Sequence, residues 1–412
     1  MSLQPVPDAV VVAEPLAWFA PGRIEVLGKH TDYAGGRSLL AAVDRGVTVT
    51  VTPADDGITA RTAAVPGELR VQPGDAAELP GGHWGTYLQS VVDRLHENFG
   101  PLAPVDVSID SNLPLASGMS SSSALVVALA VSLAEYNGFT STERWRSHIH
   151  SPADLAGYLA CFENGMNFGE LTGRRGVGTF GGSEDHTAMI CCEPDSLGLF
   201  QFSPIRHDRT IPMPPEWSFV VAVSGVAAEK TGAARDLYNR AALGVQEILR
   251  RWNAHPDLPV EQSLADALRS SEDAVDRARA LVAEDHYLSH RLAHFLAESE
   301  SIIPRAAEAL VRGDLTTFGE VVDESQQQAS LTLGNQVPET EFLARQARRL
   351  GAVAATSFGA GFGGSVWAMV PTTDADEFAG AWLERYQAQF PMVAPMASTI
   401  ITRPGGPIRP LA

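Results

Sequence analysis

The chain has 412 residues, of which 45% are hydrophobic and 19% are charged. This composition is ordinary for a soluble globular enzyme. Because a chain of this length is too long for a single hydrophobic core, we expect two or three domains around a shared cleft. The 49 acidic residues outnumber the 30 Lys and Arg, which gives a formal net charge of -19. Such a charge repels phosphate backbones and anionic lipid, so we expect no nucleic-acid and no membrane partner.

The cysteines and the N-terminus indicate a cytoplasmic protein. The chain has three cysteines, Cys161, Cys191 and Cys192, which is a poor set for a disulfide framework or a zinc cage. The N-terminal "MSLQPVPDAVVVAEP" has no basic region, and no run reaches the roughly 18 apolar residues of a membrane span. We therefore expect a mature chain without a leader or a membrane anchor.

The first half contains two glycine-rich loops beside regular elements. Residues 21 to 52 place "GKHTDYAGG" between "RIEVLG" and "GVTVTVTP", which predicts a sheet with a loop at its edge. "VDVSIDS", residues 105 to 111, alternates as a half-buried strand does. The following "NLPLASGMSSSSALVVALAVSLAEYNG" predicts a loop and then an apolar helix that stops at Gly138.

The segment "PLASGMSSSSA", residues 114 to 124, is the strongest local signal. Glycine and small hydroxyl residues at a helix start expose backbone amides toward one point, which suits a phosphate. Serine hydroxyls there can also bind Mg²⁺; a plain polar helix cap is the alternative. A Walker-type loop is excluded, because "GVAAEKTG" at 225 to 232 lacks the glycine before Lys230.

The second half is helix-rich, with helical patterns at about 152 to 166, 232 to 252, 261 to 283, 286 to 312, 314 to 329 and 338 to 350. The proline-rich "HDRTIPMPPEW", 207 to 217, is the best domain boundary, dividing the chain into 1–210 and 211–412. His286, His290 and His294 share one predicted helix face. They have the spacing of metal ligands, but Arg291 sits beside them and we favour a solvated face.

Two G-x-G-x-x-G patterns fail as dinucleotide-binding turns, since neither joins a strand to a helix. In "RRGVGTFGGSEDHTA" the glycines follow a charged pair. The residues of this segment that could take part in chemistry are Glu184, Asp185 and His186, which follow the glycine turn. In "SFGAGFGGSVWAMV", 357 to 370, β-type residues follow the glycines. The latter segment therefore predicts strand, turn and strand.

Together, "PGRIEVLGKHTDYAGG", "PLASGMSSSSA", "FGAGFGGS" and the "YN-x-R" at Tyr238 resemble the GHMP kinase superfamily, specifically galactokinases. The resemblance implies an α+β, two-domain fold. An N-terminal ribosomal-protein-S5-like α/β domain would join a C-terminal ferredoxin-like α+β domain, with the active site in the cleft. It also implies a monomeric kinase that transfers the γ-phosphoryl group of ATP, with Mg²⁺, to the C1 hydroxyl of galactose or a related sugar.

The resemblance assigns roles to residues of this chain. Asp185 would be the base for the sugar hydroxyl, and Arg23 would keep that carboxylate ionised and stabilise charge on the phosphoryl group. Each also has a structural explanation, such as an ion pair between the two. The remaining implied residues bind the sugar, the ATP or Mg²⁺: Lys29, His30, Asp32, Gly182 and Tyr238 for the sugar; Gly118, Ser120, Ser121, Ser122, Ser123 and Gly361 for ATP; Ser122 and Glu163 for Mg²⁺.

The chain departs from galactokinases at several of these positions. Galactokinases usually have Glu at Lys29, Asn at Glu25, and Met and Gln at Glu184 and His186. An ammonium in place of a carboxylate would reverse the electrostatic preference of a sugar pocket, so a sugar acid such as a uronate is an alternative substrate. A sugar sensor without turnover is a second alternative, and a mevalonate-type kinase, which "HTDY" disfavours, is a third.

Overall fold

The computed structural model describes residues 14–74, 79, 83–114, 117–174, 176–226 and 233–411. Residues 1–13 of the N-terminal segment, Leu115 and Ala116 of the serine-rich loop, and Lys230 lie outside the described residues.

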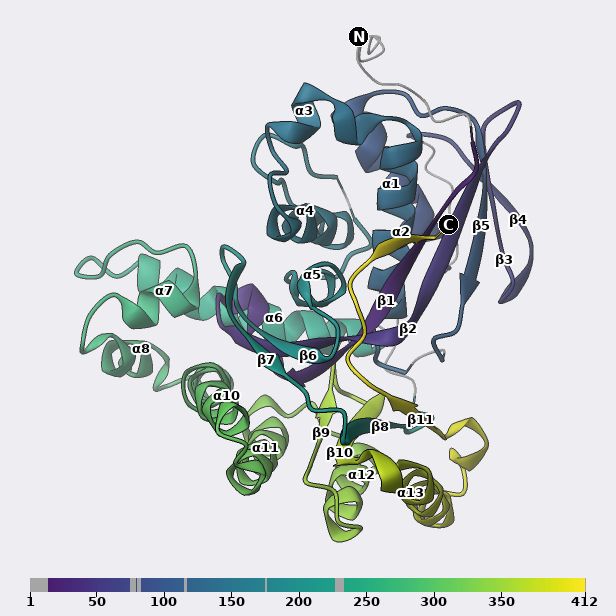
Figure 1. Ribbon diagram of the computed structural model, residues 1–412. Helices are drawn as coiled ribbons and strands as arrows, with labels where there is room; N and C mark the ends of the chain where they lie inside the picture. Colours follow the sequence, from purple (N-terminus) through teal and green to yellow (C-terminus); the bar gives the residue numbers. More distant parts are fainter. Residues whose placement is uncertain are drawn as a thin grey trace.

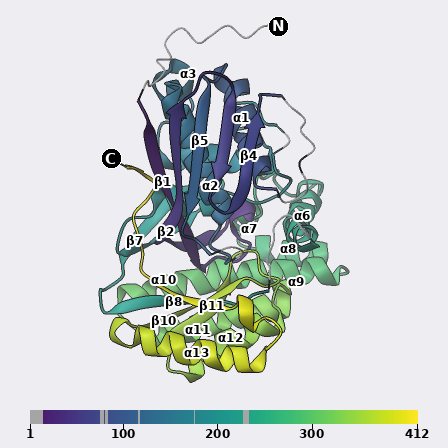
Figure 2. The ribbon, with the colours of Figure 1, turned by 90° about the vertical axis from the view of Figure 1, so that its right-hand side faces the viewer.

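The larger sheet has eight strands and fills the upper part of Figures 1 and 2. Its order is β12-β1-β2-β5-β3-β4, and β6 joins the start of β2 and pairs with β7. Neighbours are antiparallel except β3 and β5. The strands are β1 (Leu16–Leu27), β2 (Arg37–Pro53), β3 (Ile58–Thr62), β4 (Val65–Val71), β5 (Val105–Ser111), β6 (Ser196–Gln201), β7 (Arg206–Pro212) and β12 (Arg409–Leu411).

Helices pack on one face of this sheet (Figure 1). The central helix, α2 (Ser121–Tyr136), is apolar nearly all round, as a helix must be when it lies between a sheet and other helices. This burial fixes the helix start, and with it the serine-rich loop, at one end of the sheet. The neighbouring helices are α1 (Gly85–Phe99), α3 (Glu143–Arg146), α4 (Pro152–Asn164) and α5 (Glu184–Cys191).

The smaller sheet is antiparallel with the order β11-β8-β10-β9. It lies between two helix pairs, α10–α11 and α12–α13, and alternate residues of β8 face opposite sides. Val220 packs in the core formed with α12 and α13, whereas Phe219 packs in the core formed with α10 and α11. The elements are β8 (Trp217–Val223), β9 (Ala354–Phe358), β10 (Ser365–Pro371), β11 (Ser398–Thr402), α10 (Ile303–Val311), α11 (Leu315–Gln328), α12 (Pro338–Arg349) and α13 (Ala375–Gln389).

Four further helices lie between β8 and α10: α6 (Ala233–Asn253), α7 (Leu264–Arg269), α8 (Ala274–Val282) and α9 (His286–Phe295). The π-helical segment η3 (Leu296–Ile302) joins α9 to α10, and a second, η4 (Ala329–Leu333), follows α11. The short 3-10 turns are η1 (Asp32–Ala34), η2 (Phe139–Ser141), η5 (Thr372–Asp374) and η6 (Ala394–Met396).

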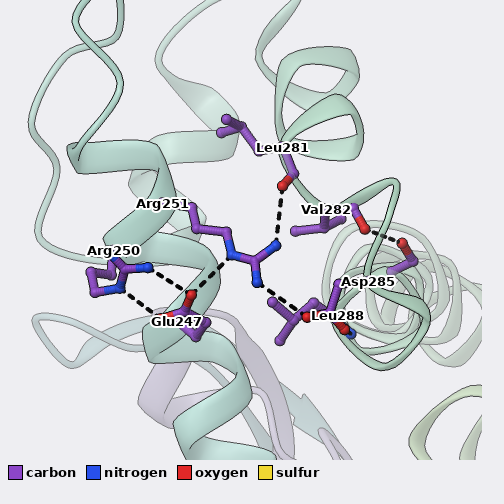
Figure 3. A network of polar contacts seen from close by, with 8 residues as sticks. Glu247, Arg250, Arg251, Leu281, Val282, Asp285 and Leu288 are labelled. Carbon is purple, nitrogen blue, oxygen red and sulfur yellow. Dashed lines mark hydrogen bonds and ion pairs between the residues drawn. The ribbon is translucent and has the colours of Figure 1, made fainter.

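A polar network anchors α6 to its neighbours (Figure 3). Glu247 accepts hydrogen bonds from Arg250 at 2.6 Å and Arg251 at 2.9 Å. These bonds lower the pKa of Glu247 to about 2. Arg251 also donates to Asp285 at 3.1 Å and to the carbonyl of Leu281. The network therefore ties α6, which carries Tyr238, to α8 and α9.

Most predicted elements are confirmed, including the strand at 105 to 111, the helix after the serine cluster and the strand-turn-strand around the third glycine motif. The single helix predicted at 261 to 283 is wrong, because residues Ser270–Asp273 separate α7 from α8. The chain passes from one sheet to the other between β7 and β8, within the proline-rich segment, and β12 then returns to the first sheet.

None of the helices in the described ranges is both long and apolar enough to cross a membrane.

Candidate active site

The three glycine-rich segments meet at one place between the two sheets. Arg23 of β1 donates from Nη1 to the carbonyl of Gly118 in the serine-rich loop. Ser365, at the end of the third glycine motif, donates from Oγ to the carbonyl of Ser117. His30 lies 2.9 Å from the carbonyl oxygen of Ala360 through its Nε2. Segments more than 200 residues apart in sequence thus lie side by side and form one wall of a cavity.

Arg23 and Asp185 form the central ion pair. Nε and Nη2 of Arg23 both lie 2.7 Å from Oδ1 of Asp185, and Ser123 donates from Oγ to Oδ2 at 3.2 Å. The Arg23 side chain is 3% exposed and the Asp185 side chain 12%. Burial alone lowers the pKa of Arg23, but the charges of Asp185, Glu184 and Glu25 together raise it above its ordinary value. Asp185 is therefore held in place by two donors at the cavity edge.

Local structure explains why these side chains converge. The pairing of β1 with β2 shifts register before Arg23 and again after Glu25, as at a β-bulge. Between the shifts the strand alternates regularly, which puts Arg23 and Glu25 on the same face and Ile24 in the core. Asp185 lies in the first turn of α5, where the helix dipole favours a negative charge.

The "HTDY" loop is held by an ordered chain of hydrogen bonds. His30 has a φ of 56°, a left-handed conformation that this loop imposes. Because the carbonyl of Ala360 can only accept, Nε2 of His30 carries the proton in the neutral ring. Nδ1 then accepts from the hydroxyl of Tyr33 at 2.8 Å, and that hydroxyl accepts from Arg291 at 3.2 Å. The chain connects α9 to the third glycine motif through His30.

The residues predicted to bind a sugar line the same cavity as Arg23: His30, Asp32, Gly182 and Tyr238. The backbone N–H of Glu184 donates to Oδ2 of Asp32 at 3.1 Å. Burial, followed by the charge of Asp32, raises the pKa of Tyr238 well above its ordinary value, so its phenol remains a hydrogen-bond donor at neutral pH. The structure brings these predicted residues together in one enclosure.

Gly182 is required here for space. A Cβ on Gly182 would lie 2.3 Å from Oδ2 of Asp32 and 2.9 Å from the amide nitrogen of Tyr33. We expect Gly182→Ala to displace the Asp32 carboxylate and lower kcat/KM for the sugar by about 10²-fold, because small misplacements near reacting groups are costly. Steady-state kinetics at varied sugar concentration measures this.

The matched control is Gly380→Ala in α13, where a Cβ meets nothing within 4 Å. Its kcat/KM should stay unchanged, and its stability should rise by about 0.4–1 kcal/mol from the lost backbone freedom of the unfolded chain. Equal kinetics in Gly182→Ala and Gly380→Ala would contradict the crowding argument.

Two carboxyl groups that galactokinases usually lack also line the cavity. Glu25 is 3% exposed and Glu184 6%, and the two groups are within hydrogen-bonding reach of each other. Burial raises the pKa of Glu25 to about 7, against the opposing charges of Lys29 and Arg23. Burial and the charge of Glu25 raise the pKa of Glu184 well above its ordinary value. A hydrogen bond between two carboxyl groups requires one proton, so the pair shares one near neutral pH.

Lys29 is not among the residues that line the cavity. It is fully buried, and its Nζ donates to Oγ of Ser325 in α11 at 2.9 Å. Ser325 in turn donates to Oε1 of Glu298, which also accepts from the N–H of Gly28 at 3.0 Å. The side chain thus points behind the loop, toward α11 and the buried carboxylate, where it anchors the loop. In this arrangement the Lys29 side chain points away from the cavity, and a contact between Lys29 and a sugar stays a prediction that this geometry does not favour.

The serine-rich loop has the chemistry of a phosphate cradle. Ser120, with a φ of 56°, precedes the 16-residue α2, and the Ser120 side chain does not cap that helix. The hydroxyl oxygens of Ser117 and Ser120 are buried and have no hydrogen-bond partner among the described residues. Buried hydroxyls and open amides at a helix start fit an anion. The segment therefore fits the triphosphate that the sequence predicts there.

The remaining predicted ATP residues lie nearby. Gly118 has a φ of 70° and faces the carbonyl of Phe358 at the end of β9. Ser121 and Ser122 begin α2, and Ser123 instead binds Asp185. Gly361 is packed against Asn335, since a Cβ would lie 2.3 Å from the Asn335 amide nitrogen. The close approach of Asn335 is enough to require glycine at position 361, so this glycine does not by itself indicate a nucleotide site.

The metal predictions have different outcomes. Glu163, 5% exposed at the end of α4, lines the cavity and lies 3.4 Å from Nε2 of His186. Ser122 and Glu163 remain a prediction for Mg²⁺. Within the described ranges, no group of three or more His, Cys, Asp or Glu has the arrangement of a metal centre. The solvated face predicted for the histidine helix is wrong for His294, which is fully buried and hydrogen-bonded to Arg291.

Sequence reasoning missed several cavity residues. Thr179 and Ala360 line the site, and neither belongs to a charged pattern that would mark it. Glu25 was recognisable, because it lies two residues after Arg23 on a strand and must share its face. No local signal points to Glu298, which approaches the loop from a helix some 270 residues away.

Family models match three parts of the chain. The galactokinase galactose-binding signature matches residues 10–53, the GHMP kinases N terminal domain residues 86–160 and the GHMP kinases C terminal domain residues 306–388. Galactokinase from Roseiflexus sp. (strain RS-1) is 30% identical over 366 residues, covering 87% of this chain and 84% of that protein. Galactokinase from Mycobacterium tuberculosis (strain ATCC 25618 / H37Rv) is 29% identical over 368 residues, covering 88% and 91%.

Solved structures share the fold. Lactococcus lactis galactokinase complexed with galactose superposes with a TM-score of 0.79 at 23% identity, covering 97% of this chain and 95% of that one. L. major mevalonate kinase in complex with R-mevalonate gives a TM-score of 0.56 at 17% identity, covering 98% and 100%. The two-domain GHMP kinase fold predicted from the sequence is confirmed.

Proposed function

The chain belongs to the galactokinase family of GHMP kinases and is a sugar kinase of that type, and we propose that it phosphorylates the C1 hydroxyl of galactose or a closely related hexose. The observation that carries this is the buried Arg23–Asp185 pair, set at the junction of the three glycine-rich segments. The pair puts a carboxylate and a guanidinium where a proton must leave and negative charge must be stabilised.

In the proposed reaction Asp185 accepts the proton of the C1 hydroxyl. The C1 oxygen forms a bond to the γ-phosphorus of ATP while the bond between that phosphorus and the β,γ-bridging oxygen breaks, which releases ADP. Ser123 and Arg23 hold the Asp185 carboxylate, and Arg23 also offsets charge that develops on the transferred group. The sugar is oriented by Asp32, His30 and Tyr238 around Gly182.

ATP would lie with its phosphates at the start of α2, near the hydroxyls of Ser117 and Ser120. Ser122 and Glu163 would hold Mg²⁺, which would neutralise negative charge on the phosphates. The uronate alternative rested on an ammonium facing the sugar, and the bond from Lys29 to Ser325 removes that reason.

The deciding experiment is ADP release with MgATP across neutral hexoses, pentoses, amino sugars and uronic acids. We expect turnover above the sugar-free rate with a galactose-type hexose, and a sugar 1-phosphate identified by phosphorus NMR. ADP release that no sugar stimulates would contradict the proposal and favour the sugar sensor. A sugar phosphorylated elsewhere than C1 would contradict the assignment of Asp185.

A further inference from the structure

The Glu25–Glu184 pair has no role in the chemistry described above, yet it lies inside the same cavity. One carboxyl oxygen of Glu184 has a hydrogen-bond donor, because Ser38 donates to Oε2 of Glu184 at 2.7 Å. Oε1 of Glu25 is buried and, apart from the carboxyl group of Glu184, has no hydrogen-bond partner among the described residues. Leaving a buried carboxyl oxygen unsatisfied costs about 1–3 kcal/mol, or more if it is charged. A cation in the cavity that replaced the shared proton would interact with both carboxyl groups.

The cations near this pair are occupied elsewhere. Arg23 is engaged with Asp185 and Gly118. Lys29 stabilises the charge of Glu25 from behind the loop, but its Nζ donates to Ser325 and its side chain does not line the cavity. A purely structural salt bridge therefore does not explain the orientation of Glu25.

The cavity as a whole is acidic. The described residues that line it include five carboxyl groups and one permanent cation, Arg23, with two histidines, His30 and His186. Even with Asp185 neutralised by Arg23 and one proton shared by the pair, negative charge remains. An enclosed site of this kind stabilises a cationic ligand and repels an anionic one. The five carboxyl groups are those of Glu25, Asp32, Glu163, Glu184 and Asp185.

The spacing suits a single sugar. Arg23 and Glu25 share one face of β1, and two strand residues span about 6.6 Å. This is the scale of a pyranose ring with its substituents, and Asp185 is bound to Arg23, so a hexose whose C1 lies at Asp185 would extend along β1 toward Glu25. On the basis of the proposed function, we propose that the preferred acceptor is an amino hexose whose ammonium group binds between Glu25 and Glu184.

The test compares kcat/KM with MgATP for galactose, galactosamine, 6-amino-6-deoxygalactose, N-acetylgalactosamine and galacturonate. We expect one of the two free amines to exceed galactose by at least about tenfold, as one charge-assisted hydrogen bond allows. N-acetylgalactosamine, which has lost the charge, and galacturonate should be poorer than that amine.

Two variants locate the effect. Glu25→Asn and Glu184→Met introduce the residues that galactokinases usually carry, and each should lower the amine-to-galactose ratio by about tenfold or more while galactose turnover persists. Glu25→Gln is the isosteric check on folding. Glu68→Gln, an exposed carboxylate on β4, is the control and should leave the ratio unchanged.

The outcomes separate the two proposals. Preference for galactose or galacturonate over both amines, or an amine preference that survives both Glu25→Asn and Glu184→Met, would overturn the amino-sugar inference and leave the kinase function standing. Silence of the wild type with every sugar would overturn the kinase function and this inference with it.

Discussion

Asp185→Asn should abolish sugar-dependent ADP release, lowering kcat by about 10²–10⁴-fold, the range expected for loss of a general base. The amide keeps the shape of the carboxylate. Its oxygen can still accept from Arg23 and its nitrogen can face Ser123, so the cavity is preserved. Binding of ATP, measured by calorimetry without sugar, should be nearly unchanged, because the phosphate loop is built from other residues.

Ser123→Ala is the matched control for this variant. It removes the hydrogen bond from Ser123 to Oδ2 of Asp185 and leaves the carboxylate in place. Its effect on kcat should be smaller than that of Asp185→Asn by at least about tenfold, since the base itself remains. Substantial residual turnover in Asp185→Asn would mean that another group accepts the proton.

Arg23→Met should damage both activity and stability. The change removes two contacts to Asp185 and one to Gly118, and it leaves a largely buried carboxylate beside Glu25 and Glu184 without its cation. Removing one partner of a buried ion pair costs about 3–5 kcal/mol of unfolding free energy. The lost charge stabilisation should also reduce kcat by about 10²–10³-fold. Thermal and denaturant unfolding and ADP release measure the two effects.

A double-variant cycle separates these effects. In Arg23→Met/Asp185→Asn no uncompensated carboxylate remains at position 185, so part of the lost unfolding free energy should return while activity stays absent. Arg23→Lys keeps the charge but loses the forked geometry, and should fall between the wild type and Arg23→Met in kcat. If the loss of unfolding free energy in the double variant equalled the sum of the losses in the two single variants, the ion pair would contribute nothing to folding.

The fold was largely predictable because each key segment has a local signature. The glycines at 357 to 365 are followed by β-type residues, which favours strand-turn-strand, and "ALVVALAVSLA" after the serine cluster predicts a buried helix. The helix predicted at 261 to 283 is interrupted by the polar, exposed run "SSED" at 270 to 273, where the backbone leaves the helix. Such a polar run is compatible with the exposed face of a continuous helix and also with a turn between two helices, so the sequence alone did not separate the two.

The candidate site was predictable only where residues lie in motifs. Arg23, His30 and Asp185 stand in segments of recognisable composition, and the structure brings them into one cavity. The direction of Lys29 was not predictable, since it depends on Ser325, which reaches it from almost 300 residues away. A lysine in a loop can point to either side, and only the tertiary partners decide which side.

The return of β12 to β1 affects how this protein is made. Residues Trp18 and Phe19 of β1 pair with Pro410 and Arg409, close to the last residues of the chain. During synthesis, this edge of the first sheet stays unpaired until β12 has been made, although β1 precedes β12 by most of the elements of the fold. An exposed sheet edge can pair with other chains. The strand that carries Arg23 is thus vulnerable to misassembly while the ribosome makes the chain between β1 and β12.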